Sequence, residues 1–249
     1  MFRIISRLDV KNENLINTVN LEGLRVVGKA KPFASQYYAN GADEIIFNDL
    51  VASLYGRNTL DELIKQISES VFVPMTVVGG IRSIKDAERV FKSGADKIGI
   101  NSAALENPTL LFELVREFGS QAIVLSIEFR IDENGIFFLL TDGGREKNKK
   151  SVVDWLREAQ DKGVGEILAT AVHKDGKLDG FDTKFVEKFE SLIKVPLIIS
   201  GGAGSIDHCL QASRLNISGI SLAGSLHTKR LSIKDIKERL LLSGVKLRL

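Results

Sequence analysis

The chain has 249 residues, of which 44% are hydrophobic and 27% are charged, and its 34 basic and 32 acidic side chains leave a formal net charge of +2. This balance argues against a protein that coats nucleic acid or another polyanion. The single cysteine, Cys209, excludes an internal disulfide and a zinc site built from several cysteines. No apolar run approaches the ~18 residues of a membrane span, and Arg3, Arg7 and Asp9 place charges in the N-terminal segment. We therefore expect a soluble globular protein of the cytoplasm.

Short, near-continuously apolar segments alternate with longer amphipathic ones, the pattern of parallel strands buried on both faces and of the helices that cover them. The predicted strands are residues 4–9, 44–49, 74–79, 97–100, 122–128, 166–171, 196–200 and 219–223. The clearest predicted helices are residues 60–70, 84–93, 108–118, 152–162 and 233–242. This alternation over about 250 residues predicts an α/β fold, a closed (β/α)8 TIM barrel that takes up residues 1–249 as a single domain. An open doubly wound sheet is the alternative.

An internal repeat favours the barrel. The pair Gly79-Gly80 falls on Gly201-Gly202 at an offset of 122 residues, and at the same offset the segment 41–49 falls on 163–171. General similarity among βα units explains the shared apolar strands, but it does not explain paired Gly-Gly turns at one fixed offset. We therefore expect two similar half-barrels that join into one barrel.

Two connections are longer than a link between strand and helix requires, residues 10–31 and residues 132–150. The second contains Glu133-Asn134-Gly135, which is a turn signal and predicts a small hairpin. Both connections leave the carboxyl ends of predicted strands, the face on which barrel active sites are built.

The two Gly-Gly turns are candidates for anion binding. Each ends a predicted strand and opens a predicted helix, where glycine lets the backbone approach an anion and the helix N-terminus supplies free N–H groups. The next strand end in each half adds Asn101-Ser102 and Gly224-Ser225. A single such turn would most often be structural, but the duplicated pair predicts two phosphate sites on opposite sides of the barrel mouth. A ligand with a phosphate at each end would fit them.

Acidic residues also stand at the strand ends. Asp9 ends the first strand and Glu128 the fifth, and these two strands lie opposite each other in an eight-stranded barrel. Two carboxyl groups that face each other between phosphate sites suit general acid–base catalysis, in which one gives a proton and the other takes one. For either residue, a helix cap or a solvated loop carboxylate is the alternative interpretation, as it is for Asp49 and Asp175.

Charged residues open four predicted strands at the opposite end of the barrel. They are Arg3, Glu44, Lys97 and Glu166. Polar residues at that end usually serve stability. Four charges of balanced sign predict a ring of salt bridges, which is either a structural plug or a functional gate. With three histidines in the chain, of which His173 follows the sixth strand, we expect neither a metal centre nor a cofactor.

Several motifs resemble the cyclase subunit of imidazole glycerol phosphate synthase. They are LDVK (8–11), GADKIGINSAALENP (94–108), FGSQA (118–122), GEIL (165–168), KDG (174–176) and SGGAG (200–204). The resemblance runs nearly end to end. It implies a (β/α)8 lyase of histidine biosynthesis that uses ammonia to cleave a bis-phosphorylated aminoimidazole carboxamide ribonucleotide and to close an imidazole ring. It also implies a glutaminase subunit that docks on the N-terminal face of the barrel and feeds ammonia through it.

The resemblance carries roles over to single residues. Asp9 matches the first catalytic aspartate of that family, and Glu128 stands where the family has the second. The residues that match substrate or phosphate contacts are Lys11, Gly80, Asn101, Ser102, Asp175, Gly176, Gly202, Gly224 and Ser225. Those that match the charged gate at the ammonia entrance are Arg3, Glu44, Lys97 and Glu166.

The departures from the family are concentrated at the chemistry. Glu128 carries one methylene more than aspartate, which moves its carboxyl by roughly an ångström, and a displacement of that size can cost about 100-fold in rate. Asn17 stands where the family has a lysine that contacts the substrate. Arg7 replaces a small residue at the barrel lumen, and His173-Lys174 occupies a place usually written Asp-Arg.

These departures leave two functions open. The first is an ordinary cyclase subunit. The second is a paralogue that retains the gate and the docking of a glutaminase but supplies ammonia to a sugar amidotransferase of surface-polysaccharide biosynthesis, with ring closure weakened or lost. A third possibility, the sister isomerase of the same pathway, is disfavoured by the gate residues and by the GEIL segment. Because Cys209 lies away from the predicted catalytic strand ends, we expect glutamine hydrolysis to belong to a partner chain.

Overall fold

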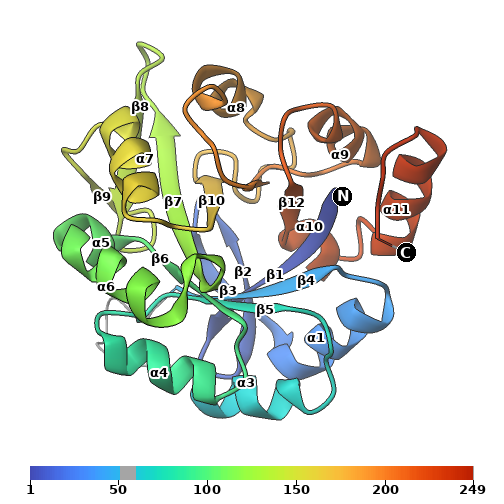
Figure 1. The fold of residues 1–249 in the computed structure, drawn as a ribbon. Helices are drawn as coiled ribbons and strands as arrows, with labels where there is room; N and C mark the ends of the chain where they lie inside the picture. The colour runs from blue at the N-terminus through green and yellow to red at the C-terminus, as the bar shows by residue number, and fades with distance from the viewer. Residues whose placement is uncertain (51–59, 249) are drawn as a thin grey trace.

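The computed structural model describes residues 1–50 and 60–248, and its centre is a closed barrel of parallel strands surrounded by helices (Figure 1). Around the barrel the strands follow in the order β1 (Arg3–Lys11), β4 (Glu44–Asp49), β5 (Met75–Val78), β6 (Lys97–Ile100), β7 (Ile123–Ile131), β10 (Glu166–Ala171), β11 (Leu197–Ser200) and β12 (Gly219–Leu222). Strand β7 pairs with β10, and β12 pairs with β1, so the sheet closes on itself. The predicted (β/α)8 barrel is confirmed, and the alternative of an open sheet is wrong.

Helices follow the strands in the predicted places. The longer ones are α1 (Ala30–Ala39), α3 (Asp61–Ser68), α4 (Ile84–Lys92), α6 (Pro108–Phe118), α7 (Val152–Asp161), α8 (Thr183–Phe189), α9 (Ile206–Ser213) and α11 (Ile233–Leu242). The short ones are α5 (Ser102–Glu106), the 3-10 turn η1 (Ser120–Ala122) and α10 (Gly224–His227). Asn107 caps α6 through its side chain, and Pro108 takes the first helical position, where its missing N–H is harmless. Within the described ranges, no helix is long and apolar enough to cross a membrane.

The interior of the barrel is layered because each strand turns alternate residues inward. Midway along the barrel axis lies a layer of aliphatic side chains, namely Ile5, Ile46, Val78, Val124, Leu168 and Ile198. Along β1 the same alternation places Arg3 before this layer and Arg7 and Asp9 after it. The apolar layer therefore separates charged side chains at the strand starts from charged side chains at the mouth.

The two halves of the barrel repeat each other in backbone detail. Gly79 and Gly201 both have φ of +97°, and a Cβ on either would come within 2.6 or 2.7 Å of a carbonyl oxygen at the end of the neighbouring strand. Ser83 and Ser205 cap α4 and α9 in the same manner, each accepting a hydrogen bond from the N–H three residues on. The 122-residue offset in the sequence is thus also a repeat of structure.

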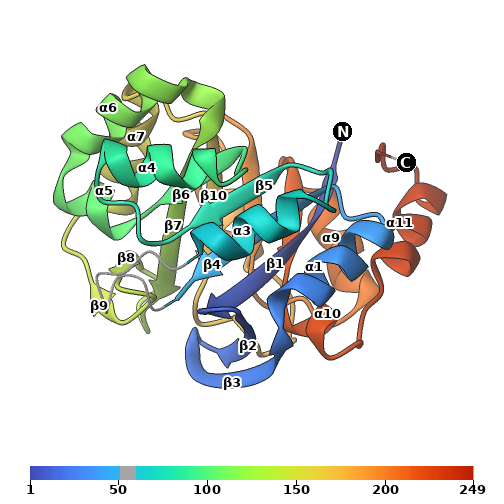
Figure 2. The same cartoon turned by 90° about the horizontal axis from the view of Figure 1, so that it is seen from below.

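Both long connections form hairpins at the carboxyl-terminal end of the barrel, and Figure 2 shows them at the end opposite the two termini of the chain. Residues 10–31 contain β2 (Asn14–Val19) and β3 (Glu22–Lys29), two antiparallel strands that the sequence pattern did not predict. Residues 132–150 contain the predicted hairpin, in which β8 (Phe137–Thr141) pairs with β7, and a short β9 (Glu146–Lys147).

The two insertions meet above the barrel mouth. Ile16 and Leu21 of the β2–β3 hairpin pack in one buried apolar cluster with Leu140 of β8 and with Val172, which follows β10. The two insertions therefore contact each other at the carboxyl-terminal end of the barrel.

Candidate active site

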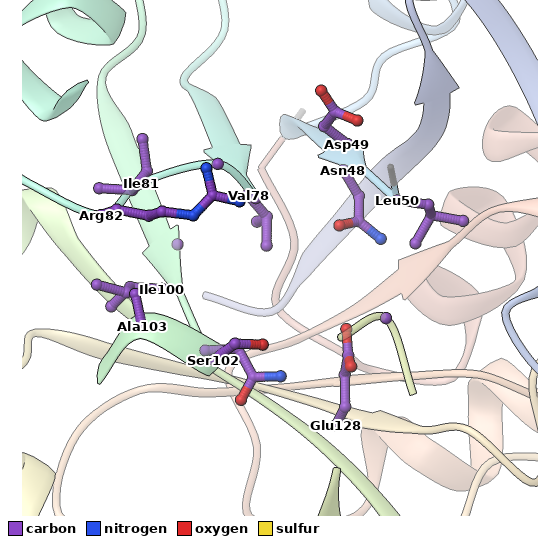
Figure 3. A pocket seen from close by; sticks show the side chains of 15 residues that line it. Asn48, Asp49, Leu50, Val78, Ile81, Arg82, Ile100, Ser102, Ala103 and Glu128 are labelled. Carbon is purple, nitrogen blue, oxygen red and sulfur yellow. The ribbon is translucent and has the colours of Figure 1, made fainter. Parts of the chain in front are cut away.

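The first half-site is a pocket of about 530 Å³ at the carboxyl ends of β4, β5, β6 and β7. It brings together Gly80, Asn101 and Ser102, the three residues predicted for one phosphate site, with Glu128. Figure 3 shows the Glu128 carboxyl on one side of this pocket and the Arg82 side chain across from it. Residues far apart in the sequence thus converge here because parallel strands end at the same face.

The β8–β9 insertion forms one wall of the first half-site. The side-chain amide of Asn101 donates to the carbonyl oxygen of Leu140 at 3.0 Å, and the Ser102 hydroxyl accepts from the backbone N–H of Asp142 at 2.9 Å. The Asn101 Oδ1 atom is buried without a hydrogen-bond partner among the described residues. The insertion therefore fixes the orientation of both predicted phosphate ligands.

The second half-site is a smaller pocket of about 300 Å³ at the ends of β10, β11 and β12. The predicted residues that line it are Asp175, Gly176, Gly202, Gly224 and Ser225. Arg7 lines it as well, from β1. The two pockets occupy equivalent places in the two halves of the barrel, as the sequence repeat predicts.

A buried ion cluster lies between β1 and the second half-site. Arg7 is 1% exposed, and its Nη2 atom lies 2.9 Å from Asp9 Oδ2 and 2.7 Å from Asp175 Oδ1. Its Nη1 atom donates to the Ser200 hydroxyl at 2.9 Å. Burial opposes the charged form of Arg7, but the two carboxylates outweigh burial and raise its pKa. Arg7 is therefore a permanent cation inside the mouth.

Asp9 is as buried as Arg7. One carboxylate oxygen accepts from Arg7, and the other accepts from the Asn48 side-chain amide at 2.8 Å. Burial raises the pKa of Asp9 and Asp175 raises it further, while Arg7 and Asn48 lower it without cancelling the rise. The Asp9 carboxyl is thus held in a fixed orientation, and its pKa lies above that of an exposed aspartate.

Glu128 differs from Asp9 in having few partners. Burial raises its pKa to about 7, and a hydrogen bond from the backbone of Gly144 only partly offsets the effect. Its Oε2 atom is buried and makes no hydrogen bond within the part of the chain that the structure describes. A carboxyl that titrates near neutral pH and opens onto a pocket can both hold and release a proton.

At the opposite end of the barrel the four predicted charges form a closed ring. Arg3 pairs with Glu44 at 3.0 Å and also with Glu166, and Lys97 pairs with Glu44 at 3.1 Å and with Glu166 at 2.8 Å. The hydroxyl of Thr76 donates to Glu44 at 2.6 Å, which holds that carboxylate in place. The predicted ring of salt bridges is present.

Comparisons with known proteins agree with this geometry. A family model described as "Histidine biosynthesis protein" matches residues 3–232. The chain belongs to the histidine biosynthesis protein family. Among its relatives, "Imidazole glycerol phosphate synthase subunit HisF" of Legionella pneumophila is 51% identical over 205 residues, which cover 82% of this chain and 97% of the relative. The protein of the same name from Streptococcus sanguinis (strain SK36) is 38% identical over 248 residues, covering 99% of this chain and 98% of the relative. The protein of this name from Thermobifida fusca (strain YX) is 38% identical over 251 residues, which cover 99% of this chain and 98% of the relative.

Three candidate residues of this histidine biosynthesis family member line neither pocket, namely Asp9, Lys11 and His173. Lys11, which the resemblance assigns to substrate contact, ends β1 and lines neither half-site. His173, which follows β10, turns away from the site: its Nε2 atom lies 2.8 Å from Asp182 Oδ2, and its ring packs beside Phe129. His173 therefore orients the segment before α8.

Sequence reasoning missed two partners of the candidate site residues. Asn48, whose side-chain amide donates to Asp9, comes directly before Asp49 at the end of β4. Its place at a strand end is the sequence signal that could have identified it. Asp142, whose backbone N–H donates to the Ser102 hydroxyl, lies in an insertion whose fold depends on pairing with β7. Its role follows from tertiary contacts and leaves no local trace in the sequence.

Proposed function

We propose that this chain is the cyclase subunit of an imidazole glycerol phosphate synthase. In this function it uses ammonia to cleave the bis-phosphorylated aminoimidazole carboxamide ribonucleotide and to close the ring of imidazole glycerol phosphate. The observation that carries the proposal is the placement of two carboxyl groups on the opposed strands β1 and β7: Glu128 lines the first half-site, and Asp9 pairs with Arg7, which lines the second. The family membership and the names of the relatives support it.

The two carboxyl groups take different roles in this proposal. Glu128, with a pKa of about 7, is protonated in a large fraction of molecules at neutral pH and gives a proton. Asp9, fixed between Arg7 and Asn48, takes a proton from the reacting ammonia or substrate. The free N–H groups near Gly80 and Gly202 hold the two phosphates at either end of the substrate. No cofactor enters this scheme.

A glutaminase partner on the N-terminal face belongs to the same proposal. The relatives are named as subunits of a synthase, which implies a partner chain. The ring of Arg3, Glu44, Lys97 and Glu166 stands at the start of the barrel axis, and a depression bounded by Met1, Gln121 and Pro196 adjoins it. In this proposal ammonia enters at that face, passes the ring and crosses the aliphatic layer to reach Asp9.

Ammonia-dependent turnover by the chain alone tests the function. The purified protein receives the bis-phosphate substrate and a high concentration of ammonium salt, without a glutaminase. We expect turnover, and we expect Asp9→Asn to lower kcat by at least about 100-fold, because a general base contributes roughly 10²- to 10⁴-fold. The matched control is Asp161→Asn, which changes an exposed carboxylate at the end of α7 and should leave turnover unchanged.

The names of the relatives do not favour the second candidate function, and the buried Arg7 cluster is the observation that speaks for it. Arg7 lines the second half-site and pairs with two carboxylates, Asp175 of that half-site and Asp9 beside it. The longer side chain of Glu128 is a further departure, in the first half-site. In this function the barrel supplies ammonia to a sugar amidotransferase of surface-polysaccharide biosynthesis, with ring closure weakened or lost. Absence of turnover that is restored by Glu128→Asp together with Asn17→Lys would favour this function over the cyclase.

A further inference from the structure

Arg7 has no counterpart in the other half of the barrel. Ile5 pairs with Glu44 in the first half as Val124 pairs with Glu166 in the second, so β1 and β7 are equivalent strands. Two residues further along, Ser126 of β7 stands where β1 has Arg7. The first half-site is therefore built without a cation at this position, and the function that Arg7 adds must be specific to the second half-site.

One carboxylate connects Arg7 with the β2–β3 hairpin. Asp175 accepts from Arg7 at Oδ1, and at Oδ2 it accepts from the Thr18 hydroxyl at 2.9 Å and from the backbone N–H of Leu21 at 3.2 Å. The backbone N–H of Asn20 donates to the Asp175 carbonyl oxygen at 3.0 Å. The tip of the hairpin is thus bound to a residue whose other oxygen is bound to Arg7.

The hairpin tip is strained and depends on these bonds. Asn20 and Leu21 have φ of +56° and +61°, which is the left-handed region, and leucine rarely adopts it. Leu21 nevertheless is 1% exposed, because its side chain packs in the cluster above the mouth. Asp175 and this packing together hold a turn that the local sequence disfavours.

We propose that Arg7 is a positioning residue that couples the binding of the β2–β3 hairpin tip to Asp175 with the ionised state of Asp9. Arg7 makes four hydrogen bonds, to Asp9, Asp175 and Ser200, so one cation holds both aspartates in place. The catalytic role of Asp9 in this inference rests on the proposed function, whereas the contacts of the hairpin do not depend on that function.

The charges around Asp9 show what the loss of Arg7 does. Among the described residues, Asp175 and Glu128 are further acidic groups that interact with this cluster, and His227 of α10 interacts electrostatically with Arg7 and Asp175. Burial lowers the pKa of His227 to about 3, so it adds no positive charge near neutral pH. Without Arg7, two buried carboxylates would face each other with no cation between them and would repel each other. The Asp175 carboxylate would then lose the partner that holds it in position to accept from Thr18 and Leu21.

Hydrogen exchange at the hairpin tip tests the coupling directly. In Arg7→Met the amide of Leu21 should exchange at least about tenfold faster than in the unaltered protein, because the Asp175 carboxylate that accepts its hydrogen bond loses its anchor. Arg7→Lys keeps the cation but cannot reach all three partners, and it should give a smaller increase. The control is Arg130→Met, which removes an arginine of the equivalent strand β7 that lies outside this cluster. Unchanged exchange in Arg7→Met would overturn the proposal.

A double-mutant cycle separates coupling from general loosening. Thr18→Val removes one hydrogen bond to Asp175 and leaves Arg7 in place, so this variant retains the ion cluster. If Arg7 acts through Asp175, the effect of Thr18→Val on Leu21 exchange should be several-fold smaller in Arg7→Met than in the unaltered background. Equal effects in the two backgrounds would show that the two sites act independently, and the proposal would be wrong.

The pH profile of ammonia-dependent turnover provides a readout that a purely structural role would not move. Loss of Arg7 should shift the acidic limb of kcat upward by about one pH unit or more, because the pKa of Asp9 rises when its cation is removed. An unshifted limb in an active Arg7→Met enzyme would contradict the role given to Arg7. If the unaltered chain shows no turnover, the proposed function fails, while the exchange cycle still decides the coupling.

Discussion

Glu128 lies in the first half-site at 8% exposure, with Oε2 unpaired among the described residues and a pKa raised by burial to about 7. Its ordinary pKa is 4.5, so between pH 4.5 and 7 the native state binds more protons than the unfolded state. The free energy of unfolding therefore falls as pH rises through this window, and the loss is complete above it. Glutamine cannot ionise, so Glu128→Gln should gain roughly 2 to 3 kcal/mol of stability relative to the unaltered protein between pH 5 and pH 8.

Urea unfolding at pH 5 and pH 8 measures this difference, and the same variant should lose ammonia-dependent turnover because it has no proton to give. Glu133→Gln, an exposed glutamate in the β7–β8 turn, is the matched control and should show no pH-dependent gain. A Glu128→Gln variant whose relative stability is the same at both pH values would show that this carboxyl has an ordinary pKa.

At the same scale, the sequence predicted which residues gather at the mouth better than how they contact one another. Gly80, Asn101 and Ser102 were placed together because strand ends of a parallel barrel share one face. The sequence identified Arg7 only as unusual. Its partners Asp9 and Asp175 are 2 and 168 residues away along the chain, and the choice between them depends on side-chain packing in the closed barrel.

Among the elements, the Gly-Gly turns are those whose backbone geometry most clearly requires glycine. Gly79 and Gly201 each combine φ of +97° with a carbonyl oxygen only 2.6 or 2.7 Å from the place where a Cβ would lie, whereas Gly135 has φ of +76° and open space around it. Alanine at Gly135 should cost about 1 kcal/mol, the ordinary penalty of a left-handed residue. Gly79→Ala and Gly201→Ala should each cost at least about 2 kcal/mol more, because the backbone must shift as well.

Chemical denaturation of the three variants under one condition checks this expectation. Similar losses for Gly79→Ala and Gly201→Ala would agree with the structural repeat. A loss no greater than that of Gly135→Ala would mean that these turns relax easily and that the glycines are retained for ligand approach alone.

The sequence predicted an element correctly where one local signal, the apolar run, dominates. It failed where tertiary contacts stabilise a turn that the local sequence disfavours. The barrel strands are buried on both faces, so an apolar run identifies β4 or β10 without further knowledge. The β2–β3 hairpin was missed because its turn is Asn20-Leu21, and leucine replaces the glycine that usually marks such a turn. The turn exists because Asp175 and the apolar cluster above the mouth stabilise it, and neither is local in sequence.

At the scale of the whole molecule, the contacts that join the two half-barrels lie at both ends of the barrel axis. At the N-terminal end Glu166 of the second half pairs with Arg3 and Lys97 of the first. At the mouth Arg7 of the first half pairs with Asp175 of the second. Two seams of parallel strand pairing, β12 with β1 and β6 with β7, run along the sides of the barrel. These joints favour a single cooperative domain over two independent halves.

Unfolding followed by two probes tests this single-domain proposal. Trp155, the only tryptophan in the chain, is fully buried in α7 and reports on the second half, whereas far-ultraviolet circular dichroism reports on both halves. The two denaturation curves should coincide, because breaking either seam exposes strand edges and the charges of the ring at the same time. Lys97→Met, which leaves Glu44 and Glu166 with Arg3 as their remaining cation in the ring, should move both curves together to lower denaturant concentration. A fluorescence transition displaced from the dichroism transition, or moved separately by Lys97→Met, would show that the half-barrels unfold as separate units.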